Sequence, residues 1–179
     1  MSALDINLEG ATIIAALKSA DVEFVVTLPD IVTCDGLLWP MSKDEDFRLV
    51  QVCKEDEGVS ICAALSYGER RAILMMQHTG LLDSINAIRA IAVEYALPVV
   101  MLVGLQGMEP GRALLESDSY GIRILPPLLK TMGVAHKVID QDADTDDMAE
   151  VIAQAYQQSE PFVFLVSRSP MAPEEGQGQ

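Results

Sequence analysis

Basic residues are scarce in this sequence. Lysine and arginine together number 12 against 27 aspartates and glutamates, so the formal net charge is −15. A surface with this excess of negative charge repels nucleic acid phosphates and anionic lipids. The composition therefore argues against nucleic acid and membranes as partners, while a local basic spot could still admit a small anionic substrate.

Long apolar runs and cysteines are scarce as well. No stretch reaches the roughly 18 apolar residues of a membrane-spanning helix, and the longest, such as ALPVVMLVG, have the length of a strand. The first residues, MSALDINLEG, carry early acids and no basic segment, so we expect no signal peptide. Three cysteines without metal-type or redox-type spacing predict reduced thiols in a cytoplasmic protein.

Common nucleotide-binding and hydrolase motifs are missing too: there is no GxGxxG after a strand, no GxxxxGK[ST], no HExxH and no GxSxG. What the sequence does have is a regular alternation of strand-like and helix-like segments. Predicted strands cover 23–28, 48–53, 72–77, 98–104, 135–140 and 161–167, and predicted helices cover 10–20, 55–68, 81–95 and 144–158. We expect a weak helical turn near Leu37 to be interrupted at Pro40, a polar loop over 105–121 and a short helix near 126–129.

Strands that alternate with helices imply crossover connections and a parallel sheet covered on both faces. We therefore predict an α/β fold, a single three-layer αβα domain with a six-stranded, mainly parallel sheet over residues 1–168, followed by a flexible tail at 169–179. In open sheets of this kind, ligands bind beyond the carboxyl ends of the strands. That rule selects four junctions as candidate sites: residues 28–30, 53–57, 77–80 and 104–107.

The second junction holds three consecutive acids, Glu55, Asp56 and Glu57. One interpretation is decoration of a helix start, where each acid contributes about 0.3–1 kcal/mol. However, the residues after Glu57 are small and apolar on nearly every face, as in a helix that is buried or lies under an interface. We therefore expect Glu57 to be desolvated and near-neutral, as suits a proton-handling group, and Glu55 and Asp56 to be solvated charges.

Two further junctions offer titratable side chains. His78 lies where a strand ends and a helix begins after Gly80, so it could exchange a proton beside an anion-binding helix start; a solvated loop histidine is the alternative. Asp30 follows a strand in the turn LPD, where capping of the next helix is the simplest role.

Taken in order, VCKEDEGVSICAALSYG, AILMMQHTGLLDSINA and LPVVMLVG resemble the pyrimidine-binding (Pyr) domain of thiamine diphosphate-dependent 2-oxoacid decarboxylases. The nearest branches are the sulfopyruvate decarboxylase α subunit and phosphonopyruvate decarboxylase. The LPD turn and the later LLKTMGV also match, so the resemblance covers about residues 10–140.

The resemblance implies roles for individual residues. A glutamate at the position of Glu57 hydrogen-bonds N1′ of the cofactor's aminopyrimidine and so promotes loss of the thiazolium C2 proton. Gln77, His78, Thr79 and Gly80 match the loop that approaches the cofactor and the substrate, although relatives often have Asn-Ser where this chain has His-Thr. The resemblance thus assigns cofactor binding to Glu57, Gln77, Thr79 and Gly80, and catalysis to Glu57, His78 and Asp30.

Asp30 falls in the turn where some of these decarboxylases keep an acid–base residue, but Ile31 replaces the serine expected after it. Whether His78 or Asp30 is the main proton-transfer residue stays open at this point.

The family's Gly-Asp-Gly signature for Mg²⁺ and diphosphate is absent, the nearest string being CDG at 34–36. The resemblance therefore implies a separate β subunit that binds Mg²⁺ and the diphosphate, an active site at the subunit interface, no metal ligand in this chain, and self-association. The implied reaction is decarboxylation of a small anionic 2-oxoacid, first of all 3-sulfopyruvate to sulfoacetaldehyde. Phosphonopyruvate decarboxylation, carboligation, and a non-catalytic binding or regulatory domain are the alternatives.

Overall fold

The computed structural model describes residues 7–172. Its centre is a sheet of six strands in the order β2-β1-β3-β4-β6-β5, and every neighbouring pair is parallel. The strands are β1 (Val22–Thr27), β2 (Arg48–Gln51), β3 (Arg71–Gln77), β4 (Val100–Gly104), β5 (Ala135–Ile139) and β6 (Phe162–Val166). The predicted three-layer α/β fold is confirmed, with a sheet that is parallel throughout.

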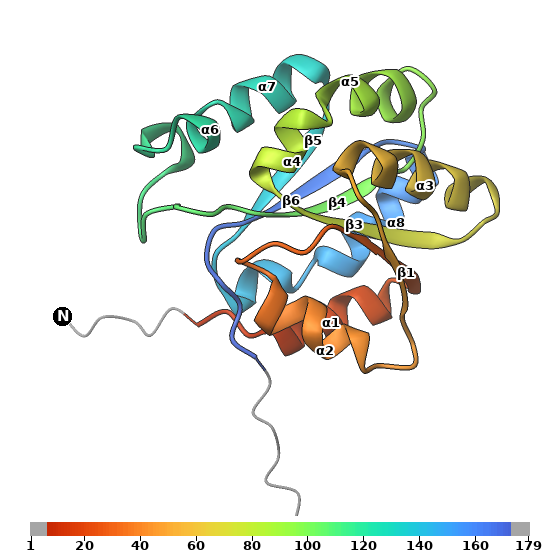
Figure 1. The fold of residues 1–179 in the computed structure, drawn as a ribbon, viewed down its shortest axis with the longest axis horizontal. Coiled ribbons are helices and arrows are strands. Elements are labelled where there is room, and N and C mark those ends of the chain that lie inside the picture. The colour runs from red at the N-terminus through yellow and green to blue at the C-terminus, as the bar shows by residue number, and fades with distance from the viewer. Residues whose placement is uncertain (1–6, 173–179) are drawn as a thin grey trace, which may run out of the picture.

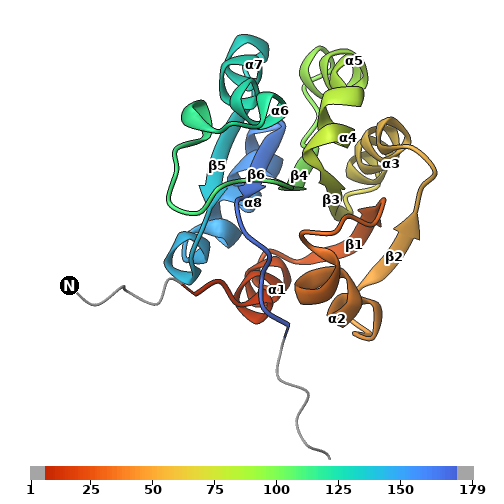
Figure 2. The ribbon, with the colours of Figure 1, turned by 60° about the vertical axis from the view of Figure 1, so that its left-hand side comes forward.

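Helices cover both faces of the sheet (Figures 1 and 2). One layer holds α3 (Glu55–Tyr67), α4 (His78–Asp83), α5 (Ile85–Ala87), the π-helical segment Ile88–Val93, α6 (Tyr120–Arg123) and α7 (Leu125–Met132). The other holds α1 (Gly10–Ser19), the π-helical segment Cys34–Leu38, α2 (Trp39–Ser42) and α8 (Met148–Gln158). Two 3₁₀ turns, Leu114–Glu116 and Asp142–Thr145, complete the elements.

The central strands explain why the sheet lies between two helical layers. All five residues of β4 are buried, as are the five inner residues of β3, Ala72–Met76. A strand that is apolar at consecutive positions buries side chains on both faces, which requires cover on both sides. The interior of both strands is therefore apolar, and polar side chains of β3 stand only at its ends, Arg71 and Gln77.

Two expectations about helices are wrong in detail. Pro40 does not interrupt the helical turn at residues 34–38, because it lies in the first turn of α2, where its missing N–H costs no hydrogen bond. The helix expected over 81–95 begins at His78 instead and breaks at Ser84 into α4, α5 and the π-helical segment. No helix among residues 7–172 is long and apolar enough to cross a membrane.

The two ends of the described chain lie together. The backbone of Met171 pairs with Leu8 and Gly10, with N–O distances of 2.8 and 2.9 Å. The first part of the expected tail, residues 169–172, therefore lies against the start of α1. The rest of it, residues 173–179, lies outside the described residues. This pairing is on the opposite side of the sheet from α3 and α4 (Figure 2).

Candidate active site

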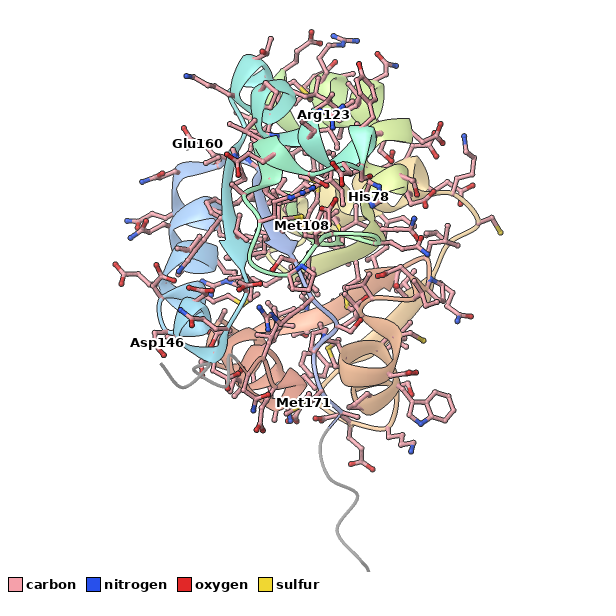
Figure 3. The ribbon with its side chains drawn as sticks, turned by 90° about the vertical axis from the view of Figure 1, so that its left-hand side faces the viewer. His78, Met108, Arg123, Asp146, Glu160 and Met171 are labelled. Atoms are coloured by element: carbon pink, nitrogen blue, oxygen red, sulfur yellow. The ribbon has the colours of Figure 1, made fainter. Side chains whose placement is uncertain are left out.

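Three strands deliver polar side chains to one edge of the sheet. β1, β3 and β4 are neighbours, and Gln77 at the end of β3 pairs with Gly104 at the end of β4. Asp30 follows β1 and His78 follows β3, so the predicted junctions at residues 28–30, 77–80 and 104–107 meet at this edge. Figure 3 looks toward this edge and labels His78 there.

Asp30 is buried, with 6% of its surface exposed. One carboxylate oxygen, Oδ1, accepts hydrogen bonds from the backbone N–H groups of Val32 (2.7 Å) and Thr33 (3.2 Å), and Oδ2 accepts one from the Thr33 hydroxyl. The side chain therefore fixes the turn before the segment 34–38, but the expected capping role is wrong, because the start of that segment has no side-chain cap. The same bonds hold the carboxylate in one orientation beside His78.

His78 is the first residue of α4 and is also only 6% exposed, so the solvated-loop interpretation is wrong. Its Nδ1 atom is buried and has no hydrogen-bond partner in the described part of the chain. Burial lowers the pKa of His78, while the nearby backbone of Gly104 and the negative charge of Asp30 act in the opposite direction. The structure thus places an imidazole with one unpartnered nitrogen, Nδ1, beside a fixed carboxylate.

Glycines allow this close packing. A methyl group on Gly104 would lie 2.5 Å from Asp30 Oδ1 and 2.8 Å from the Cβ of Val32. A methyl group on Gly121, in α6, would lie 3.3 Å from Cδ2 and Nε2 of His78. His78 is therefore enclosed between the end of β4 and α6. The sequence marks Gly104 only as the first residue of a candidate junction and gives no signal for the packing role of either glycine, because that role depends on a neighbour from another segment.

Glu57 does not have the environment expected of it. Its side chain is exposed, and Oε2 accepts hydrogen bonds from the backbone N–H groups of Cys53 (3.0 Å) and Lys54 (3.3 Å). It is the third residue of α3, and a glutamate at that position commonly closes the helix start in this way. The expectation that Glu57 is buried is therefore wrong for this chain by itself, because the outer side of α3, including Tyr67, is uncovered.

Glu55 also differs from its expectation as a solvated charge. It is half-buried, and its carboxylate lies over Gly80: a Cβ built on that glycine would be 2.2 Å from Oε1 and 2.4 Å from Cδ. The start of α3 and the turn into α4 are thus in direct contact. Residue spacing gives no signal for this contact, because it joins the junctions after β2 and β3, which have β1 between them in the sheet.

Asp56 and the neighbouring lysine link the same two helices. Lys54 Nζ lies 3.9 Å from a carboxylate oxygen of Asp56 and 3.3 Å from one of Asp83 in α4. The other oxygen of Asp56, Oδ1, is buried and has no hydrogen-bond partner among residues 7–172. The three consecutive acids therefore have three different surroundings.

The loop residues Gln77 and Thr79 are linked by a hydrogen bond in which Gln77 Nε2 donates to Thr79 Oγ1 (3.0 Å). Gln77 is half-buried and Thr79 is exposed, so both lie at the rim next to His78. Within residues 7–172, no group of three or more histidine, cysteine, aspartate or glutamate side chains could hold a metal ion. The edge therefore offers carboxylate, imidazole, amide and hydroxyl groups.

The carboxyl edge of the sheet is hollowed further along, beyond β4. A cavity of about 430 Å³ separates residues 108–114 from the ends of β5 and β6, where Asp140 and Ser167 line it. Arg112, on the loop, pairs with Glu109 (3.3 Å) and Asp118 (2.8 Å). Its guanidinium is therefore already paired with two carboxylates, which argues against a ready anion site there.

These features define a parallel α/β domain whose titratable side chains gather at the carboxyl ends of three central strands. No protein-family model matches the chain. Curated proteins do: the chain is 27% identical over 159 residues to sulfopyruvate decarboxylase of Methanosarcina acetivorans, an alignment that covers 87% of this chain and 39% of that protein.

Two related subunits also match. Sulfopyruvate decarboxylase subunit alpha of Methanococcus maripaludis is 30% identical over 92 residues, 51% of this chain and 54% of that subunit. The subunit alpha of Methanothermobacter thermautotrophicus is 28% identical over 95 residues, 53% of this chain and 57% of that subunit. The resemblance to sulfopyruvate decarboxylases that the residues indicated is thus confirmed by sequence similarity. Each alignment covers less than two thirds of the length of the relative.

The burial of His78 leads to a testable pH dependence. The pKa of His78 is lower in the folded chain than its ordinary value of 6.5. As the pH falls below 6.5, the histidine is therefore protonated in the unfolded chain before it is protonated in the folded chain. We expect the free energy of unfolding to decrease as the pH falls from about 6.5 through the lowered pKa. Urea unfolding between about pH 7.5 and 5.5, with His78→Gln as the comparison, measures this. A wild-type curve parallel to that of the variant would contradict it.

Proposed function

We propose that this chain is the Pyr-domain α subunit of a thiamine diphosphate-dependent decarboxylase of a small anionic 2-oxoacid, first of all 3-sulfopyruvate. The observation that carries the proposal is the similarity to sulfopyruvate decarboxylases. The alignment with the M. acetivorans protein covers 87% of this chain. The cluster at the ends of β1, β3 and β4 supports it, because ligands of parallel α/β sheets bind at that edge.

The residues at this edge suit the pyrimidine half of the cofactor. Carboxylates at the start of α3, the free Nδ1 of His78 and the Gln77–Thr79 pair offer hydrogen bonds, and Gly80 and Gly104 allow close approach. Gln77, Thr79 and Gly80 are the residues we assign to cofactor binding, together with a glutamate of the acidic turn. Glu57 is the glutamate indicated by the sequence motif.

Thiamine diphosphate, when bound, would supply an electron sink for the electron pair released when CO₂ leaves. In the net reaction, the C1–C2 bond of 3-sulfopyruvate breaks, CO₂ leaves, and C2 takes up one proton to give sulfoacetaldehyde. His78 can hold that proton at Nδ1, where the charge of Asp30 stabilises the protonated ring. Asp30 thereby acts on His78 through its charge, and the burial of both residues keeps water away from the proton.

The proposal includes a partner. Mg²⁺ and the diphosphate would be bound mainly by a β subunit, and the matched relatives named as subunit alpha support the existence of such a chain. The exposed side of α3, with Tyr67 73% exposed, is available for the β subunit or for a second copy of this chain. Covering it would also bury Glu57.

The test is reconstitution with a candidate β subunit. We expect the complex, given thiamine diphosphate and Mg²⁺, to release CO₂ and sulfoacetaldehyde from 3-sulfopyruvate, and neither chain to do so alone. Phosphonopyruvate and pyruvate measured in parallel define the substrate class. If the complex binds the cofactor but prefers phosphonopyruvate, the proposed substrate is wrong and the proposed class of enzyme stands. If the complex binds no cofactor, the proposal is contradicted.

A further inference from the structure

We infer that Thr33 is a positioning residue of the site: its hydroxyl holds the second carboxylate oxygen of Asp30 and so keeps the charge of Asp30 beside His78. The inference rests on the proposed function for its catalytic consequence, and it names a residue that the sequence did not indicate. Thr33 follows Asp30 by three positions, in the turn between β1 and the segment 34–38. It acts through Asp30 and is not itself a catalytic residue.

The two oxygens of the Asp30 carboxylate are held in different ways. Oδ1 accepts from the backbone N–H groups of Val32 (2.7 Å) and Thr33 (3.2 Å), and neither donor depends on the side chain at position 33. Oδ2 accepts from the Thr33 hydroxyl, which is the only donor to this oxygen within residues 7–172. A hydrogen bond to a charged oxygen is among the stronger ones in proteins. The hydroxyl therefore decides the direction of Oδ2, because a carboxylate bonded at Oδ1 alone can still turn about that anchor.

This hydrogen bond is enclosed by the chain itself. Thr33 is 1% exposed and Asp30 is 6% exposed, so the bond is shielded from water without any partner subunit. The end of β4 closes the other side of the carboxylate, because a methyl group on Gly104 would lie 2.5 Å from Oδ1. A buried carboxylate oxygen without a donor is strongly disfavoured. Loss of the hydroxyl therefore makes the carboxylate turn toward solvent or take up a proton, and both withdraw negative charge from His78.

His78 responds to the charge of Asp30. Burial lowers the pKa of His78, and the negative charge of Asp30 counteracts that lowering. Other charged or titratable side chains on the helices around His78 have surroundings of their own: Glu55 over Gly80, Asp56 and Asp83 near Lys54, Glu57 at the start of α3, and Arg123 over the ring of Tyr120. A change at Thr33 is therefore expected to reach His78 through Asp30.

The test uses Thr33→Val in the reconstituted complex, because valine removes the hydroxyl and keeps a β-branched side chain. We expect kcat for 3-sulfopyruvate to fall about tenfold, with KM within about threefold of wild type, since Thr33 does not bind the substrate. Thr33→Ser keeps the hydroxyl and should restore kcat to within about threefold of wild type. In the Asp30→Asn background, Thr33→Val should change kcat by less than about twofold, because no charge is left to position.

Thr145→Val is the matched control. Thr145 is also buried, and its hydroxyl also donates to an aspartate three positions earlier, but to the backbone oxygen of Asp142 (2.7 Å), in the 3₁₀ turn after β5. We expect this variant to lower the Tm about as much as Thr33→Val does and to keep kcat near the wild-type value. Equal losses of kcat in the two valine variants would overturn the inference, because the effect would then follow from stability alone.

A titration of His78 in the chain alone separates this inference from the proposed function. The chain contains two histidines, so His136→Gln leaves His78 as the only imidazole in the proton NMR spectrum. In this background, Thr33→Val should lower the pKa of His78, and Thr33→Ser should leave it near the wild-type value.

An unchanged His78 pKa in Thr33→Val would overturn the positioning role and leave the proposed function standing. A full loss of kcat on adding Thr33→Val to the Asp30→Asn background would do the same, because Thr33 would then act without Asp30. A wild-type complex without decarboxylation would overturn the proposed function, while the titration would still decide whether Thr33 positions Asp30.

Discussion

Replacing Asp30 with alanine is expected to lower the free energy of unfolding of this chain by about 2–4 kcal/mol. The carboxylate accepts hydrogen bonds from two backbone N–H groups and from the Thr33 hydroxyl, all in the interior. Alanine leaves these donors without a partner, and a buried donor without a partner costs far more than an average hydrogen bond contributes. Urea unfolding of the chain, followed by far-ultraviolet circular dichroism, measures the loss.

Asp30→Asn is the matched control. The asparagine carbonyl oxygen can still accept from the N–H groups of Val32 and Thr33, so most of the stability should remain. The negative charge beside His78 is lost, however, and the pKa of that histidine should fall further. Equal stability in the alanine and asparagine variants would show that these hydrogen bonds do not hold the turn.

The placement of Asp30 and His78 shows how far the sequence predicts this molecule. Alternating strand-like and helix-like segments are set by local residue pattern, so the six strands and their parallel arrangement are predictable. The rule that ligands bind beyond the carboxyl ends of strands then brings the junctions after β1, β3 and β4 to one edge. That both side chains are buried there is not predictable, because burial depends on α6 and on the end of β4.

The acidic turn shows where sequence reasoning fails. Glu55, Asp56 and Glu57 are adjacent in the chain, and a charge pattern cannot tell which carboxylate turns inward. Their directions follow from the start of α3, because Glu57 at the third helical position bonds back to Cys53 and Lys54. Glu55 then meets Gly80, a contact between segments about 25 residues apart that no local pattern encodes.

The glycine at the end of β4 gives the last prediction. Gly104→Ala should lower the activity of the reconstituted complex by about 100-fold and the free energy of unfolding by about 1–3 kcal/mol. The added methyl group would lie 2.5 Å from Asp30 Oδ1 and 2.8 Å from the Cβ of Val32, both closer than non-bonded contact allows. Asp30 is fixed by three hydrogen bonds and cannot move aside freely, so the strain displaces the carboxylate from His78.

Gly68→Ala is the control for this substitution. Gly68 ends α3 with a φ of −84°, which alanine adopts without strain, and its nearest contact for a new methyl group is 3.3 Å away. It should leave both activity and stability close to wild type. Both variants add one methyl group to a glycine, one at the end of β4 and one at the end of α3. Decarboxylation rates and urea unfolding curves of the two variants therefore show whether the effect depends on the position of that methyl group. If Gly104→Ala behaved like Gly68→Ala, the close packing of β4 against Asp30 would not matter for the site, because the carboxylate could then shift without consequence for His78.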